Sequence, residues 1–331
     1  MSPQPLGSLS SDPALEASMT AAMDRVEIAL HEAIKSDYPF VTETSAHLVD
    51  AGGKRFRPLL TLLAAQFGNP ERTEVIEAAV VVELTHLATL YHDDVMDEAM
   101  MRRGAASANA RWDNSIAILT GDFLFARASD ILADLGPEAV RIQARTFERL
   151  CIGQIRETVG PVDGADPVAH HIEVLADKTG SLIATAGRFG AMLSGTDTAT
   201  TEVLTKFGEC IGVAFQLADD LVDITSESEQ SGKTPGTDLR EGIPTLAGLI
   251  AMSSSDPADV RLKSLLARPL PDDAEHAEAL ALLRNHKAIS EARAQAHKWA
   301  DNARASLIEL PDVPARAALE SLCDYVVSRT G

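Results

Sequence analysis

Apolar residues recur at three- and four-residue spacing along almost the whole chain of 331 residues. In the stretch 71–97, Val75, Ala78 and Val82 fall on one stripe, and Pro70 precedes it. This spacing is the period of an amphipathic helix, and proline is favoured where a helix begins. Alanine, leucine and glutamate are plentiful, aromatic residues make up only 4%, and no segment indicates a convincing hairpin. We therefore predict an all-α protein.

The same spacing predicts further helices at 122–135, 137–159, 167–193 and about 201–224. Glycine and proline interrupt helical patterns, and they separate these segments at Gly136, Gly160-Pro161 and Gly195. The stretch 226–242 is polar and contains Pro235, so we predict a loop of functional size there.

No break in this pattern has the composition of a domain linker. We therefore predict one domain over residues 21–331, which with 45% hydrophobic content is long enough to bury a large core. Residues 1–20 are rich in serine and proline but lack a basic segment followed by an apolar one. They are predicted to be a flexible leader and not a secretory signal.

The net charge of -20 argues against binding nucleic acid through a broad basic surface. Cys151, Cys210 and Cys323 lie far apart and form no CxxC pair, so the sequence indicates neither a disulfide framework nor a zinc site. No uninterrupted apolar run approaches the roughly 20 residues that a bilayer span needs. We expect a soluble, cytoplasmic protein.

Two acidic motifs, each DDxxD, end two of the predicted helices. Positions i and i+4 share a helix face, so Asp93 and Asp97 place two carboxylates together, and Asp219 and Asp223 do the same. Like charges at this spacing destabilise a bare helix, which predicts a bound cation. Magnesium prefers carboxylate and phosphate oxygens. The sequence therefore predicts two magnesium-binding surfaces that face one diphosphate.

Clusters of cations accompany the acidic motifs. Gly52-Gly53-Lys54-Arg55-Phe56-Arg57-Pro58 places three cations within four positions, and its glycines permit close approach of the backbone. Arg102-Arg103-Gly104 follows the first acidic motif, and guanidinium groups match phosphate oxygens in two directions. Lys178-Thr179-Gly180 adds a further cation and a hydroxyl. This combination predicts diphosphate binding.

Three of these motifs resemble those of the trans-isoprenyl diphosphate synthase family, in particular its long-chain polyprenyl branch. They are GGKRxRP from Gly52, DDxxDxxxxRRG from Asp93 and FQLADDLVD from Phe215, and the similarity spans roughly residues 51–248. The resemblance implies a single-domain isoprenoid synthase fold, with helices around a central catalytic cavity, and a homodimer. It implies successive head-to-tail condensation of isopentenyl diphosphate with an allylic diphosphate, farnesyl or geranylgeranyl diphosphate, giving all-trans polyprenyl diphosphate.

The resemblance also assigns roles to individual residues. The diphosphate of isopentenyl diphosphate is expected to bind Lys54, Arg57, His86 and Arg103. The allylic diphosphate is expected to contact Arg102, Lys178, Thr179, Gln216 and Lys233. Magnesium, as three ions with substrate bound, is expected to bind Asp93, Asp97, Asp219, Asp220 and Asp223, with Asp94 assisting. The catalytic set is thus Asp93, Asp94, Asp97, Arg102, Lys178 and Asp219.

In the family mechanism, metal and cations stabilise charge on the departing pyrophosphate, so the allylic carbon–oxygen bond ionises where water is excluded. The isopentenyl double bond then attacks the allylic cation. Short-chain relatives commonly close the product tunnel with an aromatic residue near Ala88, whereas this chain has Ala88, Thr89 and Leu84. We expect an octaprenyl or nonaprenyl-class product for a menaquinone side chain, with peripheral membrane contact during product release.

Two departures from the family pattern are visible. Many relatives carry a lysine after the second acidic motif, where this chain has Ile243. One anion contact is therefore either absent or supplied by Lys233 or Arg240. The stretch 151–157 exchanges the usual glutamate and glutamine. Neither change removes a predicted metal ligand.

Two other functions remain open from the residues alone. A class I terpene cyclase also ionises an allylic diphosphate with magnesium, but the intact second DDxxD and the 52–58 cluster count against it. A catalytically silent partner subunit of a hetero-oligomeric synthase is the other, and such subunits typically lose acidic ligands that this chain retains.

Overall fold

The computed structural model describes residues 11–226 and 235–328. Within these residues the regular structure is helical apart from one pair of two-residue strands, which confirms the all-α prediction. The chain divides into two compact units. The first unit comprises the described residues among 1–147, 182–208 and 307–321, and the second comprises those among 148–181, 209–306 and 322–331.

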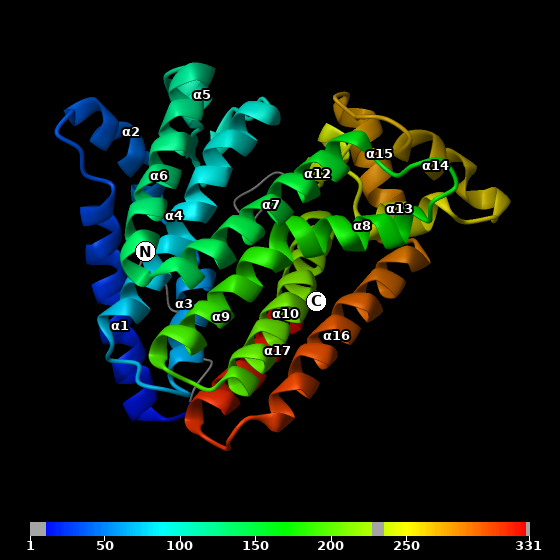
Figure 1. The fold of residues 1–331 in the computed structure, drawn as a ribbon. Helices are drawn as coiled ribbons and strands as arrows, with labels where there is room; N and C mark the ends of the chain where they lie inside the picture. Colours follow the sequence, from blue (N-terminus) through cyan, green and yellow to red (C-terminus); the bar gives the residue numbers. More distant parts are fainter. Residues whose placement is uncertain (1–10, 227–234, 329–331) are drawn as a thin grey trace. The chain divides into compact units, whose positions relative to one another are not determined.

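The first unit contains most of the long helices of the amino-terminal half (Figure 1). Its elements are α1 (Pro13–Ala33), α2 (Pro39–Asp50), α3 (Phe56–Ala65), α4 (Thr73–Met96), β1 (Met101–Arg102), β2 (Ala105–Ala106), α5 (Ala108–Arg111), α6 (Asn114–Leu135), the first part of α7 (Pro137–Val159), α9 (Ser181–Ser194), the first part of α10 (Thr198–Thr225), the 3₁₀ turn Leu307–Glu309 and most of α17 (Pro314–Ser328).

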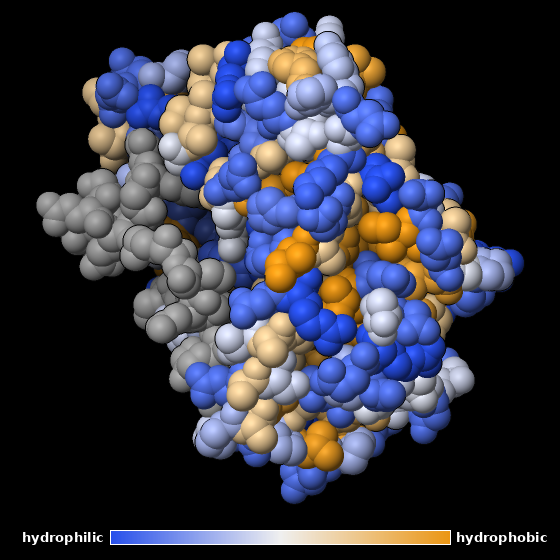
Figure 2. All heavy atoms as spheres, turned by 90° about the vertical axis from the view of Figure 1, so that its left-hand side faces the viewer, coloured by the Kyte–Doolittle hydropathy of each residue, from blue (hydrophilic) through white to orange (hydrophobic). Residues whose placement is uncertain are grey.

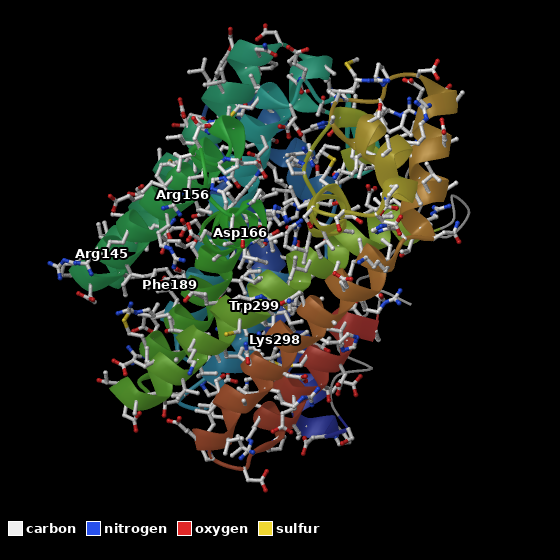
Figure 3. All side chains as sticks on the ribbon, turned by 90° about the vertical axis from the view of Figure 1, so that its right-hand side faces the viewer. Arg145, Arg156, Asp166, Phe189, Lys298 and Trp299 are labelled. Carbon is white, nitrogen blue, oxygen red and sulfur yellow. The ribbon has the colours of Figure 1, made fainter. Side chains whose placement is uncertain are left out.

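The second unit contains the remaining parts of α7, α10 and α17 and a series of shorter helices. These are α8 (Pro167–Leu175), the π-helical turn Ala176–Gly180, α12 (Thr237–Glu241), α13 (Leu246–Met252), the 3₁₀ turn Pro257–Asp259, α14 (Val260–Leu266), α15 (Asp273–Arg284) and α16 (Lys287–Ser306). Their core consists of aliphatic residues, mostly leucines and alanines, to which α10, α13, α15 and α16 contribute most and α8, α12 and α14 one each. Trp299 of α16, labelled in Figure 3, packs against this core.

Helix α4 is the centre of the first unit. It packs against α1, α3 and α6, and Figure 1 shows α1, α4 and α6 side by side. Every residue of α4 from Ala78 to Thr85 is buried, so the helix is covered all round and not only along one stripe. A helix that is apolar on every side belongs in a core. The face in Figure 2 is mostly hydrophilic, with hydrophobic residues scattered over it.

Helix α1 begins inside the segment for which we predicted a leader. Pro13 occupies its first turn, and the Asp12 carboxylate accepts a hydrogen bond from the Leu15 backbone N–H at 2.8 Å. Leu15 and Met19 are buried. The cap and these two apolar contacts stabilise helix in residues 13–20, while residues 1–10 lie outside the described part.

Three other boundaries differ from the prediction. Helix α6 begins at Asn114 and not near 122, because the Asp113 carboxylate caps it through the Ile116 N–H at 2.8 Å. The predicted helix 167–193 is divided by the π-helical turn, and the predicted loop 226–242 contains α12. The hairpin of β1 and β2 was not predicted, since strands of two residues leave no alternating pattern.

Gly190 sets the closest approach between α9 and α3. A Cβ atom added there would lie 2.0 Å from the carbonyl oxygen of Thr61, so the backbones would have to separate. Alanine at a helix position gains about 1 kcal/mol over glycine, whereas overpacking costs typically about 1–3 kcal/mol and at times more.

We predict that Gly190→Ala destabilises the protein despite alanine's better helix propensity, by about 1–3 kcal/mol in urea unfolding. An equal or higher free energy of unfolding would show that α9 moves away from α3 at no cost.

Candidate active site

The first acidic motif lies at the end of α4, in the first unit. Asp93 is half-buried, and Asp97 is exposed at the C-cap, with its N–H donating to the Asp93 carbonyl at 2.8 Å. Asp94 is fully buried and accepts a hydrogen bond from Arg102 Nε at 2.5 Å. The motif therefore divides into two partly or fully exposed carboxylates and an inner one that holds Arg102.

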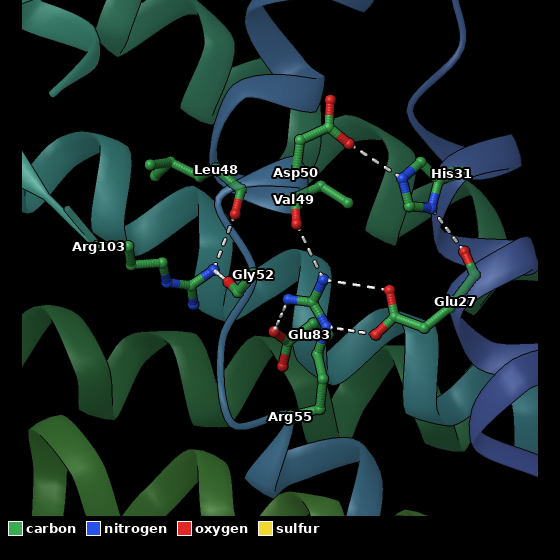
Figure 4. Close-up of polar contacts among 9 residues, drawn as sticks. All are labelled: Glu27, His31, Leu48, Val49, Asp50, Gly52, Arg55, Glu83 and Arg103. Atoms are coloured by element: carbon green, nitrogen blue, oxygen red, sulfur yellow. Dashed lines mark hydrogen bonds and ion pairs between the residues drawn. The ribbon is translucent and has the colours of Figure 1, made fainter. Parts of the chain in front are cut away.

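A hairpin places the two arginines that follow. Arg103 and Gly104, the two residues between the strand pairs, have φ of 53° and 79°. Positive φ at both central positions is the pattern of a type I′ turn, which suits the twist of a two-residue hairpin. The side chain of Arg103 returns to the end of α2 and to the 52–55 loop that follows it. Its Nη1 donates to the Leu48 carbonyl of α2 at 2.8 Å and to the Gly52 carbonyl of the loop (Figure 4).

The basic loop needs both of its glycines. Gly52 has φ of 82°, a region that disfavours other residues. A Cβ on Gly53 would lie 2.9 Å from Cζ of Arg103, so the guanidinium packs directly on the loop backbone. Lys54 is exposed, whereas Arg55 is buried. The structure thus separates the three cations of this motif, since Arg55 faces the interior.

Arg57, His86 and Arg103 form a cationic region. The pKa of Arg57 is lowered to about 10, mainly by burial and also by Arg103, while Glu83 acts in the opposite direction. The pKa of His86 is lowered well below its usual range, first by burial and then by Arg57 and Arg103. The histidine is therefore neutral at pH 7, beside arginines that remain charged. Such a region can bind a diphosphate through charge and hydrogen bonds together.

The second acidic motif lies on α10, in the second unit. Asp219 is half-buried, and Asp220 is buried and accepts a hydrogen bond from Gln216 Nε2 at 2.9 Å. Gln216 Oε1 in turn accepts from the Thr179 hydroxyl at 3.2 Å. The structure thus brings together the predicted residues Thr179, Gln216 and Asp220.

Burial is the main cause of a raised Asp220 pKa, to about 7, and the neighbouring Asp219 and Asp223 carboxylates add to it. Nε2 of His171 lies 3.8 Å from Oδ2 of Asp220. Burial lowers the pKa of His171 to about 4, so this histidine is neutral and the contact is not an ion pair at pH 7.

Asp223 has a structural partner. Its carboxylate accepts hydrogen bonds from the backbone N–H groups of Thr237 and Asp238, at 3.3 and 3.2 Å, at the start of α12. Its carbonyl accepts from the Gly236 N–H at 2.8 Å. Asp223 therefore fixes the chain that follows Pro235, and Lys233 lies outside the described residues.

The π-helical turn positions Lys178. Arg149 and Arg156 of α7, the latter labelled in Figure 3, each donate to the Asp177 carboxylate at 2.9 Å. Lys178 Nζ forms an ion pair with Glu157 at 2.5 Å. π-Helical turns occur frequently at functional sites. Sequence reasoning missed the clamp on Asp177 and the Glu157 partner, because residues 21 to 28 positions apart carry no local signal.

The residues predicted to set chain length lie in the first unit, two of them buried and Thr89 half-buried. Leu84 and Ala88 are fully buried, and the Thr89 hydroxyl donates to the His86 carbonyl at 2.8 Å. Gly121 of α6 lies against this part of α4, since a Cβ there would be 3.1 Å from the Ala88 carbonyl oxygen. Ala88 is thus at a close helix–helix contact.

Arg240, a candidate replacement for the lysine found in many relatives where this chain has Ile243, contacts residues that follow α14, and its role as a replacement stays a prediction. It donates to the Pro271 carbonyl at 3.1 Å and pairs with Asp273 at 2.9 Å.

Each acidic motif offers a pair of carboxylates, a number that suits magnesium binding. Over residues 11–226 and 235–328 no group of three or more histidine, cysteine or carboxylate side chains is preassembled for a metal ion. Magnesium commonly keeps waters and uses one or two carboxylates plus substrate phosphates. The carboxylates of half-buried Asp93 and exposed Asp97 have the oxygen chemistry for this kind of binding.

Comparisons with known proteins agree with these motifs. Residues 38–283 match the family model described as polyprenyl synthetase. The chain belongs to this family. A nonaprenyl diphosphate synthase of Mycobacterium tuberculosis is 50% identical over 97% of this chain and 96% of its own length. An octaprenyl diphosphate synthase of Escherichia coli is 32% identical over 93% of this chain and 95% of its own length.

A solved structure is similarly close. The geranylgeranyl pyrophosphate synthase of Corynebacterium glutamicum, in complex with calcium and isoprenyl diphosphate, has a TM-score of 0.88 and 46% identity, and the match covers 97% of this chain and 99% of that one. These findings confirm the predicted family with its long-chain branch, the all-α isoprenoid synthase fold and the prenyltransferase class. The prediction of one domain over 21–331 stays a prediction.

Gly153 allows α7 to approach the π-helical turn. A Cβ there would lie 2.7 Å from the backbone nitrogen of Lys178. We predict that Gly153→Ala shifts the turn and raises the KM for the allylic diphosphate about tenfold or more, since small misplacements of binding groups are costly. Steady-state kinetics with the allylic substrate varied will measure this.

Gly180→Ala is the matched control, because a Cβ on Gly180 meets its nearest atom at 3.4 Å, an ordinary contact on the same turn. Equal kinetics for the two variants would show that the turn does not position Lys178.

Proposed function

We propose that this protein is a magnesium-dependent all-trans polyprenyl diphosphate synthase, which condenses isopentenyl diphosphate successively with an allylic diphosphate primer. The observation that carries the proposal is the cationic region of Arg57, neutral His86 and Arg103 on the helix and loops beside the first DDxxD motif. A terpene cyclase needs no second diphosphate site, whereas a chain-elongating synthase binds two diphosphates.

Isopentenyl diphosphate binds this cationic region, with Lys54 at its exposed edge. Arg57 and Arg103 supply permanent charge, and His86, being neutral, contributes a hydrogen bond without adding to the repulsion among the cations. Because Arg103 donates hydrogen bonds to the Leu48 and Gly52 carbonyls, it also keeps the loop and the hairpin together.

The allylic diphosphate binds the acidic motifs through magnesium. Magnesium, when bound, supplies neutralisation of the charge that develops on the leaving pyrophosphate. Asp93 and Asp97, and Asp219 with Asp220 and Asp223 nearby, provide oxygen ligands. Three ions are expected with substrate present, and the calcium in the Corynebacterium glutamicum complex supports divalent metal use in this family.

Arg102 and Lys178 are the cations for the allylic diphosphate, with Thr179, Gln216 and Lys233 as further contacts. Asp94 holds Arg102, and Glu157 holds Lys178, in the absence of substrate. These partners reduce the number of rotamers that each cation must give up on binding, so less conformational entropy is lost.

The product is proposed to be of the octaprenyl or nonaprenyl class, serving as a menaquinone side chain. The nonaprenyl and octaprenyl diphosphate synthases among the relatives support this length. The protein is further proposed to be a cytoplasmic homodimer with peripheral membrane contact during product release. Among the described helices, none is both long and apolar enough to cross a bilayer.

The metal assignment predicts that Asp93→Ala and Asp219→Ala each lower kcat by at least about 100-fold, because each removes an oxygen ligand that stabilises the leaving group. Pyrophosphate release with magnesium, isopentenyl diphosphate and farnesyl diphosphate measures this, and circular dichroism checks the helical content. Asp130→Ala, an exposed aspartate on α6, is the control. Activity near the wild-type level in either site variant would contradict the assignment.

The tunnel assignment predicts that Ala88→Phe shortens the product, because a phenyl ring would obstruct the path beside α4. Mass spectrometry of the products measures the length distribution. Since Ala88 is fully buried, the larger side chain should also lower stability by about 1–3 kcal/mol. A folded variant with an unchanged distribution would place the tunnel elsewhere.

A further inference from the structure

Arg55 occupies a fixed position in the interior of the first unit. Its side chain is 3% exposed, so it is not available to a substrate at the surface of the loop. Its neighbours Lys54 and Arg57, by contrast, are exposed and half-buried. One motif of three cations therefore contains one that faces away from the ligands of the other two.

Three hydrogen-bonding groups surround the Arg55 guanidinium (Figure 4). Nε and Nη2 donate to the two carboxylate oxygens of Glu27 at 2.6 and 3.2 Å. Nη1 donates to Glu83 at 2.9 Å, and Nη2 also donates to the Val49 carbonyl at 3.1 Å. Glu27 lies on α1, Val49 on α2 and Glu83 on α4. A single side chain thus connects the loop to three helices.

The backbone at Arg55 is equally constrained. Arg55 has φ of 47°, a left-handed conformation that is costly for a residue with a Cβ, and it is the N-cap residue of α3. The side-chain contacts compensate for this conformation. They fix the direction in which the chain leaves Gly53 and enters α3, and so the relative directions of Lys54 and Arg57.

Arg55 also forms an ion pair with the Glu83 carboxylate. This carboxylate is 2% exposed and acts on the pKa values of both Arg57 and Arg103. An unpaired carboxylate in this position would attract those two arginines and compete with a diphosphate for them. With Arg55 bonded to it, Glu83 stabilises the neighbouring cations without capturing them.

We propose that Arg55 is a positioning residue for isopentenyl diphosphate binding, acting through the 52–55 loop with the start of α3 and through Glu83, and not by contact with substrate. This rests on the proposed function, which assigns Lys54, Arg57, His86 and Arg103 to that diphosphate. Glu27 and Glu83 are its partners in this role. None of the three touches the reacting atoms.

The test is Arg55→Lys, which keeps the charge but has only three donors on one nitrogen, so it cannot reproduce the four hydrogen bonds that the three nitrogens of Arg55 donate. The KM for isopentenyl diphosphate should rise about 10- to 100-fold, as expected for misplaced binding groups. The KM for the allylic diphosphate should change by less than about threefold, which is well under the tenfold minimum expected for isopentenyl diphosphate. Calorimetric titration with isopentenyl diphosphate and with inorganic pyrophosphate, without metal, should show the same loss of affinity.

Glu27→Gln provides a milder variant, because Glu27 is 36% exposed and the amide can still accept one hydrogen bond. It should raise the KM for isopentenyl diphosphate less than Arg55→Lys does. Arg127→Lys is the matched control. Arg127 of α6 also contacts α1, the helix that carries Glu27, because its Nε donates to the Ala33 carbonyl at 2.7 Å, but it does not contact the loop. It should change the melting temperature without changing either KM.

A lower melting temperature for Arg55→Lys with unchanged affinity for isopentenyl diphosphate would show that the role is structural only. An equal rise in both KM values would also overturn the proposal. If the wild-type protein forms no prenyl product, the proposed function fails, and the metal-free titrations then decide separately whether Arg55 positions an anion-binding loop.

Discussion

Paired charges in partly or fully buried positions hold the candidate site together. Arg55 with Glu27 and Glu83, Arg102 with Asp94, and Lys178 with Glu157 each join residues from different elements. A buried charge without a partner is strongly unfavourable, so removal of one member penalises the whole local arrangement. Arg102 and Lys178, the cations proposed for the allylic diphosphate, are thereby held in defined orientations, and such preorganisation lowers the entropic cost of binding.

The aspartates of the two acidic motifs differ in burial and in hydrogen bonding in the same order. In each, the first aspartate is half-buried, the second is buried and accepts a hydrogen bond, and the third lies at or near the helix end. Asp94 accepts from Arg102, and Asp220 accepts from Gln216. Successive helical residues differ by about 100° in direction, so adjacent carboxylates cannot serve the same ion with the same geometry. Each inner aspartate also accepts a hydrogen bond from a neighbouring polar side chain and so orients it.

Much of this was predictable from sequence. Helical periodicity gave the class of fold, and the order of motifs led to the family. Proline, glycine and the 3.6-residue period located α4, α7 and α10 to within a few residues. The acidic and basic candidates were found because their chemistry is concentrated in short motifs.

The rest depended on contacts between distant residues. Glu27 and Arg55 are 28 positions apart, as are Arg149 and Asp177, and no local pattern joins them. The sequence predicts continuous helix through the π-helical turn, because the residues of the turn carry no local signal that distinguishes it from α-helix. The inward direction of Arg55 could not be predicted either, since all three cations of the 52–58 motif have the same charge and only the backbone conformation separates them.

Helix α4 also fixes the spacing and the relative directions of the side chains along it. It carries Glu83, His86, Ala88 and Asp93 on one unbroken rod, with Asp97 at its C-cap, and each helical residue adds about 1.5 Å and turns about 100°. An insertion or deletion of one residue between His86 and Asp93 would therefore swing every later side chain to another face. Length variation in this protein should consequently be confined to its connecting loops, while the spacing along this rod is fixed by the backbone itself.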